Sequence, residues 1–213
     1  RRDPDAEITI VERGDLFSYA GCGMPFYIEG AIDDIQNLLC TPLGVRRDEA
    51  YFESVKDVKI LGRTEAQRIN REEKTVTVED LDTGETFDLP YDKLVLGVGA
   101  HAFMPPIEGM KLDGVYRLYN PHDAQAIRER LDMGVKDIAI VGGGLIGLEV
   151  CGAFHSRGCN VTILEMMGQL VPTLLDDDMA LLLGNYLEEE GIRLELGNSA
   201  TGILDNGEGR VSG

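Results

Sequence analysis

The stretch that decides the fold is Asp137-Ile-Ala-Ile-Val-Gly-Gly-Gly-Leu-Ile-Gly147. Its first five residues form a short apolar run, which predicts a buried strand over 137–141. The pattern G-x-G-x-x-G follows directly, with glycines at Gly142, Gly144 and Gly147. After a strand, such glycines are typical of a dinucleotide-binding unit, because they let the backbone approach a pyrophosphate.

A helix and a second strand complete this pattern. The helix is predicted from about Leu145 to Arg157, because Gly158 then ends it. The strand Asn160-Val-Thr-Ile-Leu-Glu165 ends in an acid about 20 residues beyond the loop, where a carboxylate accepts hydrogen bonds from ribose hydroxyls. This acid favours NADH over NADPH, since it would repel a 2′-phosphate and the two methionines that follow supply no cation. We therefore predict that the cofactor contacts Gly142, Gly144, Leu145, Ile146, Gly147 and Glu165. The alternatives are a glycine-rich structural turn and a solvated acid at a strand end.

The strand and its terminal acid occur twice. Glu7-Ile-Thr-Ile-Val-Glu12, followed by Gly14, repeats the pattern of residues 160–168 and predicts another buried strand. The same spacing would place its glycine loop before residue 1, so we expect the chain to be truncated there. A hairpin around Asn206-Gly207 opens shortly before residue 213, which suggests truncation at that end as well.

Between the two copies the sequence alternates and then turns helical. Residues 75–89 predict an antiparallel hairpin or meander, and 93–99 predict a buried strand ending in glycines. A helix is predicted to begin at Asn120-Pro121 and to stop at Gly134. The expected class is α/β, with two Rossmann-like FAD- and NAD(P)-binding units in three layers with parallel sheets, and a small antiparallel meander. We predict the remainder of an FAD-binding domain over 1–112 and an NAD(H)-binding domain over 113–213.

Composition excludes several classes of function. The formal net charge is -18, and no block of lysine or arginine offers a nucleic-acid surface. No apolar run reaches the roughly 18 residues of a membrane span. The four cysteines show neither CxxC nor His/Cys ligand spacing, so we expect no metal site, no disulfide framework and a reducing, cytoplasmic setting.

Cys22 is the candidate for redox chemistry. It lies just before Pro25, which suits the first turn of a helix, and helix N-termini favour the thiolate form of cysteine. From the residues alone, an inert cysteine packed in an apolar stretch is the alternative.

The longer motif Ser18-x-x-x-Cys22-Gly-Met-Pro-Phe-Tyr-Ile28 resembles the single-cysteine branch of the pyridine nucleotide-disulfide oxidoreductases. That branch contains coenzyme A-disulfide reductases, NADH-dependent persulfide reductases, NADH oxidases and NADH peroxidases. The resemblance extends over the chain, through Glu12-Arg-Gly, Tyr91-Asp-Lys-Leu-Val-Leu with 97–100, and 141–149. It implies that the first unit binds FAD, that the second binds NAD(H), and that Cys22 and Ser18 are catalytic.

The resemblance also implies roles for individual residues. Glu12 would bind the adenosine ribose of FAD with Arg13 beside it, Ala66 would meet the adenine through its backbone, and Gly99 would approach the phosphates. Glu149 would lie near the nicotinamide. The simpler interpretations are a solvated acid for Glu12, packing for Ala66 and a helix surface charge for Glu149. Arg1 and Arg2 would be remnants of a helix that contacts a coenzyme A tail in relatives.

Three positions depart from patterns within this family. Tyr27 stands where the two-cysteine branches place the second cysteine of CxxxxC. The atom bonded to an oxidised Cys22 sulfur must therefore come from outside the motif or be the oxygen of a sulfenic acid. Leu145 replaces an aromatic residue that many relatives place over the flavin, and Gly97-Val-Gly99 replaces the commoner Ala-Thr-Gly. Pro25 and the two aromatic residues after it resemble the coenzyme A-disulfide and persulfide reductases.

The expected function is an FAD-dependent, NADH-linked reduction of a coenzyme A disulfide, persulfide or polysulfide through Cys22. Coenzyme A is a possible partner as a mixed disulfide on that cysteine. The partners implied are a small thiol or disulfide and, in the entire protein, a second copy in a homodimer; the 213 residues are expected to be inactive alone. The first alternative is an NADH oxidase or peroxidase that uses a cysteine sulfenic acid. A non-catalytic NAD-binding regulatory module is the other.

Overall fold

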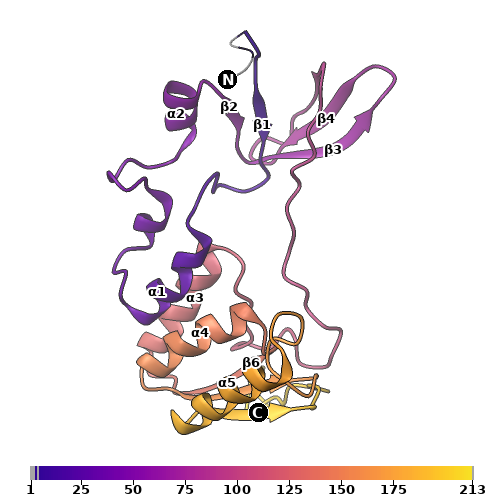
Figure 1. Ribbon diagram of the computed structural model, residues 1–213. Coiled ribbons are helices and arrows are strands. Elements are labelled where there is room, and N and C mark those ends of the chain that lie inside the picture. The colour runs from indigo at the N-terminus through magenta and orange to yellow at the C-terminus, as the bar shows by residue number, and fades with distance from the viewer. Residues whose placement is uncertain (1–2, 4, 213) are drawn as a thin grey trace. The chain divides into compact units, whose positions relative to one another are not determined.

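The computed structural model describes residue 3 and residues 5–212, which form two compact units (Figure 1). The first unit comprises the residues up to Ala20 together with Gln36–Ala100. The second comprises Gly21–Ile35 together with the residues from His101 onward. Each unit is therefore built from two separate stretches of chain. The division into functional domains at residues 112 and 113 stays a prediction, and Arg1 and Arg2 lie outside the described residues.

The second unit is built on a three-stranded parallel sheet. Its strands β6 (Asp137–Val141), β7 (Asn160–Glu165) and β8 (Arg193–Leu196) lie in that order, with Asp137 opposite Asn160. Helix α4 (Leu145–Ser156) packs on β6 and β7, and α5 (Asp177–Glu189) packs on β8. The central strand β7 holds a fully buried residue, Ile163. The strands and the helix predicted around the glycine loop are confirmed.

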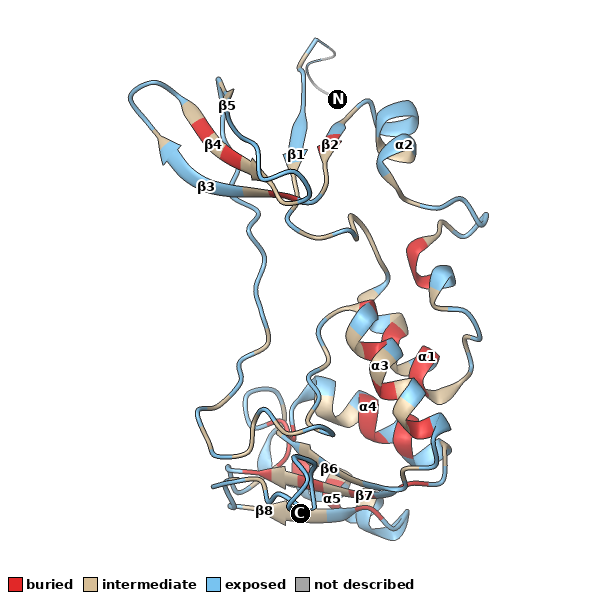
Figure 2. Cartoon of the chain, turned by 180° about the vertical axis from the view of Figure 1, so that it is seen from behind, coloured by how far each residue is buried: buried red, intermediate tan, exposed pale blue. Residues whose placement is uncertain are grey.

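A second helical layer covers α4. Helix α1 (Met24–Glu29) packs against both α4 and α3 (Pro121–Asp132), and Figure 2 shows buried positions where these helices meet. A capping box begins α3, because Asn120 accepts the N–H of Asp123 and the Asp123 carboxylate accepts the N–H of Asn120. Gly134 ends it with a positive φ of 95°. Both predicted ends of this helix are confirmed.

The first unit contains two small sheets. Strand β1 (Thr9–Val11) pairs in parallel with β2 (Lys59–Leu61). The other sheet is antiparallel in the order β3 (Thr64–Asn70), β4 (Thr75–Asp80) and β5 (Thr86–Pro90). The predicted meander is thus confirmed, with β3 as a strand that the sequence pattern missed.

Short helical turns connect these elements. Helix α2 (Glu49–Tyr51) is capped by the Asp48 carboxylate and continues into a wider turn over Phe52–Lys56. Two 3-10 turns span Gly21–Gly23 and Ile35–Leu39. The predicted hairpin near the end of the chain is present, since Asp205 forms an antiparallel bridge with Val211.

Two predicted strands need correction. Residues 93–99 form no strand, and Val95 and Val98 are 88% and 87% exposed. A buried strand needs hydrogen-bonding neighbours, and no strand of the described residues pairs with this segment. The strand predicted over 7–12 is only three residues long, and Ile10 is 40% exposed because β2 is its one described neighbour.

The observed class is α/β, with parallel sheets and a three-stranded antiparallel sheet. The assignment of these sheets to two three-layer Rossmann-like units, each truncated at one end, stays a prediction. Among the helices of the described residues, none has both the length and the apolar character that crossing a bilayer requires.

Candidate active site

The backbone geometry of the loop between β6 and α4 requires glycine at its first and last motif positions. Gly142 has a φ of 113°, which side chains other than hydrogen rarely allow. A Cβ on Gly147 would lie 2.1 Å from the carbonyl oxygen of Gly142, so only glycine lets helix and loop approach so closely. These two positions fix the path of the backbone from strand to helix.

Gly144 has a different explanation. It caps the N-terminus of α4 in an ordinary extended conformation, with φ -83° and ψ -175°. A Cβ there would meet no protein atom within 4 Å. Leu145 and Ile146 are also exposed, and the N–H groups of a first helical turn have no carbonyl partner within the helix. This open helix N-terminus therefore fits the pyrophosphate of a dinucleotide, which the second glycine of the motif admits.

Glu165 binds the glycine loop directly. Its Oε2 accepts the N–H of Gly143 at 2.8 Å, and its Oε1 accepts the N–H of Met167 at 2.8 Å. The residue is only 8% exposed. A carboxylate has about four acceptor positions, so the two bonds leave capacity for a ribose hydroxyl. The sequence did not predict that Glu165 accepts hydrogen bonds from the backbone of its own unit. These two bonds explain why a carboxylate is tolerated in a buried position. Glu149 lies exposed on α4.

Cys22 is exposed and lies in the 3-10 turn Gly21–Gly23 that leads into α1. Pro25 occupies the first turn of α1 as predicted. The helix is fixed by three buried side chains, those of Met24, Tyr27 and Ile28. The structure therefore places Cys22 in the same unit as the glycine loop. Ser18 is half-buried and belongs to the first unit, so its catalytic role stays a prediction.

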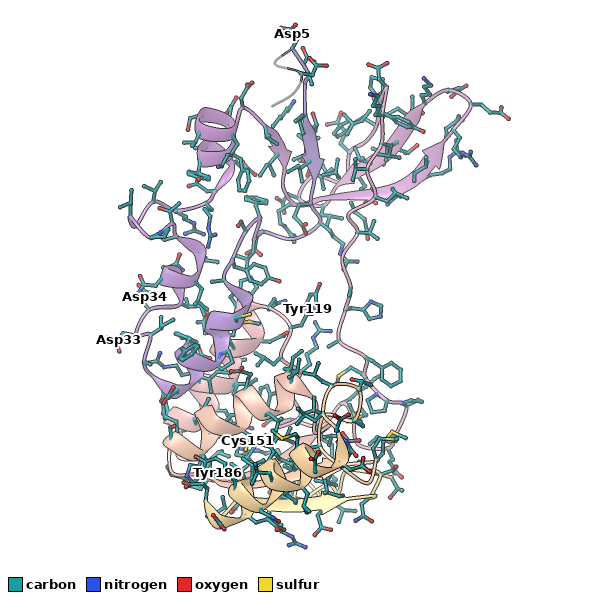
Figure 3. All side chains as sticks on the ribbon, viewed as in Figure 1. Asp5, Asp33, Asp34, Tyr119, Cys151 and Tyr186 are labelled. Carbon is teal, nitrogen blue, oxygen red and sulfur yellow. The ribbon has the colours of Figure 1, made fainter. Side chains whose placement is uncertain are left out.

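The other cysteines are less accessible. Cys151, labelled in Figure 3, lies on α4. It is 1% exposed, and burial raises the pKa of its thiol to about 11. Cys159 is also buried, and Cys40 is half-buried. Within the described residues, no group of three or more His, Cys, Asp or Glu side chains is arranged to hold a metal ion.

The predicted FAD residues of the first unit lie on adjoining segments. Glu12 follows β1, and its Oε1 accepts the N–H of Gly14 at 2.7 Å. Its backbone oxygen accepts the N–H of Thr64, which brings the start of β3 alongside. Arg13 reaches Glu65 at 3.4 Å, and the next residue, Ala66, is exposed at an irregularity in the pairing of β3 with β4. The half-buried Glu12 and the exposed Arg13 and Ala66 fit the adenosine end of a dinucleotide.

Gly99 differs from this group. It lies in the segment after Lys93 that forms no strand, where it is exposed with a positive φ of 66°. That backbone conformation explains the glycine without a ligand. Its predicted approach to the FAD phosphates stays a prediction.

Residues 1–212 match the family model described as pyridine nucleotide-disulphide oxidoreductase. The chain belongs to this enzyme family. Members of this family use FAD and NAD(P)H. This agrees with the prediction of one flavin and one nicotinamide cofactor.

Named relatives of the pyridine nucleotide-disulphide oxidoreductase family include several activities. An NADH oxidase of Methanocaldococcus jannaschii is 36% identical over 90% of this chain and 42% of the relative. A coenzyme A disulfide reductase of Staphylococcus haemolyticus is 32% identical over 97% of this chain and 45% of its own. The structure of a NAD-dependent persulfide reductase from A. fulgidus matches with a TM-score of 0.92, at 37% identity over 96% of this chain and 37% of that protein. The chain thus spans less than half the length of these relatives.

Proposed function

We propose that this chain is the part of an FAD-dependent, NADH-linked oxidoreductase that reduces a coenzyme A disulfide, persulfide or polysulfide through Cys22. One observation supports the proposal: the exposed Cys22 lies in the turn that leads into α1, in the unit that also contains the open glycine loop. A nucleophilic thiol and a dinucleotide site are the two parts that such a reaction needs.

The residues that we assign to the cofactors combine the open glycine loop with the roles that the family resemblance implies. The open first turn of α4 would hold the NADH pyrophosphate, with Gly144, Leu145 and Ile146 at its surface. Glu165 would accept a ribose hydroxyl, and Glu149 would lie near the nicotinamide. On the first unit, FAD would contact Glu12, Arg13, Ala66 and Gly99. When bound, the two cofactors supply the electron pair that a single thiol lacks.

Cys22 performs the exchange with the substrate. Its thiolate attacks one sulfur of a small disulfide, forms a mixed disulfide with that half, and releases the other half as a thiolate. An electron pair must then cleave the mixed disulfide, which releases the second half and restores the Cys22 thiolate. Neither Cys151 nor Cys159 can replace it, because both are buried. With Tyr27 at the CxxxxC position, the mixed disulfide forms with an external thiol such as coenzyme A.

Intact-mass spectrometry of the entire protein under non-reducing conditions tests this function. We expect an adduct of coenzyme A mass that dithiothreitol removes. It should be absent from Cys22→Ser and present in the control Cys40→Ser, and Cys22→Ser should lose NADH-dependent reduction of coenzyme A disulfide. Unchanged turnover in Cys22→Ser would contradict the thiol mechanism.

A second candidate is an NADH oxidase or peroxidase, favoured by the exposure of Cys22 and by the name of the Methanocaldococcus jannaschii relative. Cys22 would then cycle through a sulfenic acid, which dimedone traps. Dimedone labelling of Cys22 after exposure to peroxide, with no coenzyme A adduct, would favour this candidate. A protein without bound flavin would instead favour the regulatory module. For the entire protein we propose a homodimer.

A further inference from the structure

Arg128 binds the backbone that follows Cys22. This arginine of α3 donates from Nη1 to the carbonyl oxygens of Tyr27 at 3.0 Å, Ile32 at 2.8 Å and Asp33 at 3.2 Å. Asp33 is labelled in Figure 3, in the loop that follows α1. One guanidinium group therefore joins the last turn of α1 to the loop that leaves it.

The same guanidinium lies over an aromatic ring. Its central carbon is 4.5 Å from the centroid of the Tyr27 ring, a distance at which a cation is attracted to the ring face. Tyr27 is itself buried. Arg128 thus contacts both the backbone and the side chain of one residue of α1, and a planar guanidinium suits such stacking better than an ammonium group.

A second arginine approaches the same helix end. Arg157, which follows α4, donates from Nη1 to the carbonyl oxygen of Ile28 at 3.5 Å while Nη2 pairs with Asp132. Consecutive carbonyl groups in the last turn of α1 thus accept hydrogen bonds from cations of two different elements. Helix C-termini carry partial negative charge, so these cations stabilise α1 electrostatically.

Helix α1 needs this support. It has six residues and no basic residue in its own last turn. Isolated helices shorter than about 12 residues are marginal in water, so packing and the two arginines must hold it in place. Cys22 lies in the 3-10 turn Gly21–Gly23 that leads into this helix, and Gly23 is the N-cap between them. The position of the sulfur therefore depends on how the other end of α1 is anchored.

We infer that Arg128 is a positioning residue for Cys22. It holds the C-terminal end of α1 against α3 and thereby fixes the turn that carries the thiol. The inference rests on the proposed redox role of Cys22, because only then does the position of the thiol affect turnover. Arg157 contributes a weaker contact of the same kind.

The test uses three variants of the entire flavin-loaded protein. Arg128→Met removes the donors and the charge, Arg128→Lys keeps the charge without the planar group, and Arg130→Met is the control. Arg130 lies on the same helix and pairs with Asp113. The measurements are the rate of Cys22 alkylation by iodoacetamide between pH 6 and 9, NADH-dependent reduction of coenzyme A disulfide, and flavin reduction by NADH without disulfide.

We expect Arg128→Met to change the pH profile of Cys22 alkylation and to lower disulfide turnover by about tenfold, since small displacements of a reacting group are costly. Flavin reduction by NADH should stay within about twofold of the wild type in the same sample, because none of the residues that we assign to the cofactors lies in α1. Arg128→Lys should give values between those of the wild type and Arg128→Met. Arg130→Met should match the wild type in all three measurements.

An unchanged alkylation profile and unchanged turnover in Arg128→Met would overturn the inference. If that variant does not fold, Arg128→Lys decides: wild-type values in both measurements would overturn it, and a shifted profile would support it. A separate control keeps the two proposals apart. Turnover that survives in Cys22→Ser disproves the redox role, whereas a wild-type alkylation profile together with wild-type turnover in Arg128→Met disproves only the positioning.

Discussion

The two copies of the strand with a terminal acid, residues 7–14 and 160–168, share a local structure and differ in their surroundings. In each copy one carboxylate oxygen accepts the N–H two residues later, from Gly14 to Glu12 at 2.7 Å and from Met167 to Glu165 at 2.8 Å. In the second copy the other oxygen also binds the glycine loop through Gly143. Equivalent isoleucines show the consequence, since Ile10 is 40% exposed and Ile163 is 0% exposed.

The sequence pattern therefore determines the turn after the strand, whereas the burial of the strand depends on its neighbours. Strand β7 pairs with β6 and β8, while β1 pairs with β2 alone among the described strands.

The largest effect is expected from truncating the two equivalent isoleucines. Ile163→Ala should lower the free energy of unfolding by about 4 kcal/mol, because it leaves a cavity in a closed core. Ile10→Ala should cost less than about 1 kcal/mol, because solvent already reaches that side chain. Urea unfolding followed by circular dichroism measures both. Equal costs would show that the two strands are equally buried.

The next effect separates two glycines of one loop. Gly147→Ala should lower the free energy of unfolding by about 3 kcal/mol, because its Cβ would lie 2.1 Å from the Gly142 oxygen. Gly144→Ala meets no such obstacle and should change the free energy of unfolding by less than about 1 kcal/mol, yet weaken NADH binding. Thermal unfolding and NADH titration are the measurements. Wild-type NADH affinity in Gly144→Ala would argue against the pyrophosphate site.

A smaller difference is expected between the two acids. Glu165→Gln places an amide group beside a backbone N–H in a buried site and should cost about 2 kcal/mol of unfolding free energy. Glu12→Gln should cost less than about 1 kcal/mol, because Glu12 is half-buried and water can satisfy the amide. Urea unfolding again compares them. A larger cost at Glu12 would reverse the comparison.

The smallest effect is a pH dependence of the free energy of unfolding, caused by Cys151 on α4. Burial raises the pKa of Cys151 to about 11 from an ordinary value of 9.0. The folded protein therefore keeps a proton that the unfolded chain loses, so the stability should fall as pH rises from about 9 to 11. Cys151→Ala should show a shallower fall in urea unfolding at pH 8 to 10.5. An identical slope would mean that α4 is not closed around this thiol.

Sequence reasoning succeeded where local signals were complete. The apolar strands 137–141 and 160–165, the glycine loop between them and the helix capped by Asn120 are all formed by residues close in sequence. It failed where partners decide the outcome. Residues 93–99 have the composition of a buried strand but no described strand beside them, and β3 was missed because its sequence is mostly polar.

The candidate site shows the same limit. Motif spacing was sufficient to select Cys22 and Glu165 as candidates. It could not show that Glu165 binds Gly143, nor that Arg128 anchors the helix after Cys22, because those contacts join residues far apart in the chain.

The anchoring of α1 also has a consequence for synthesis of the chain on the ribosome. Arg128 follows Tyr27 by 101 residues. Synthesis proceeds at about 5–20 residues per second, so the partners of α1 in α3 are made roughly 5–20 s after the turn around Cys22. During that interval the segment lacks the contacts that hold α1, and its final position is set only when Arg128 has been made.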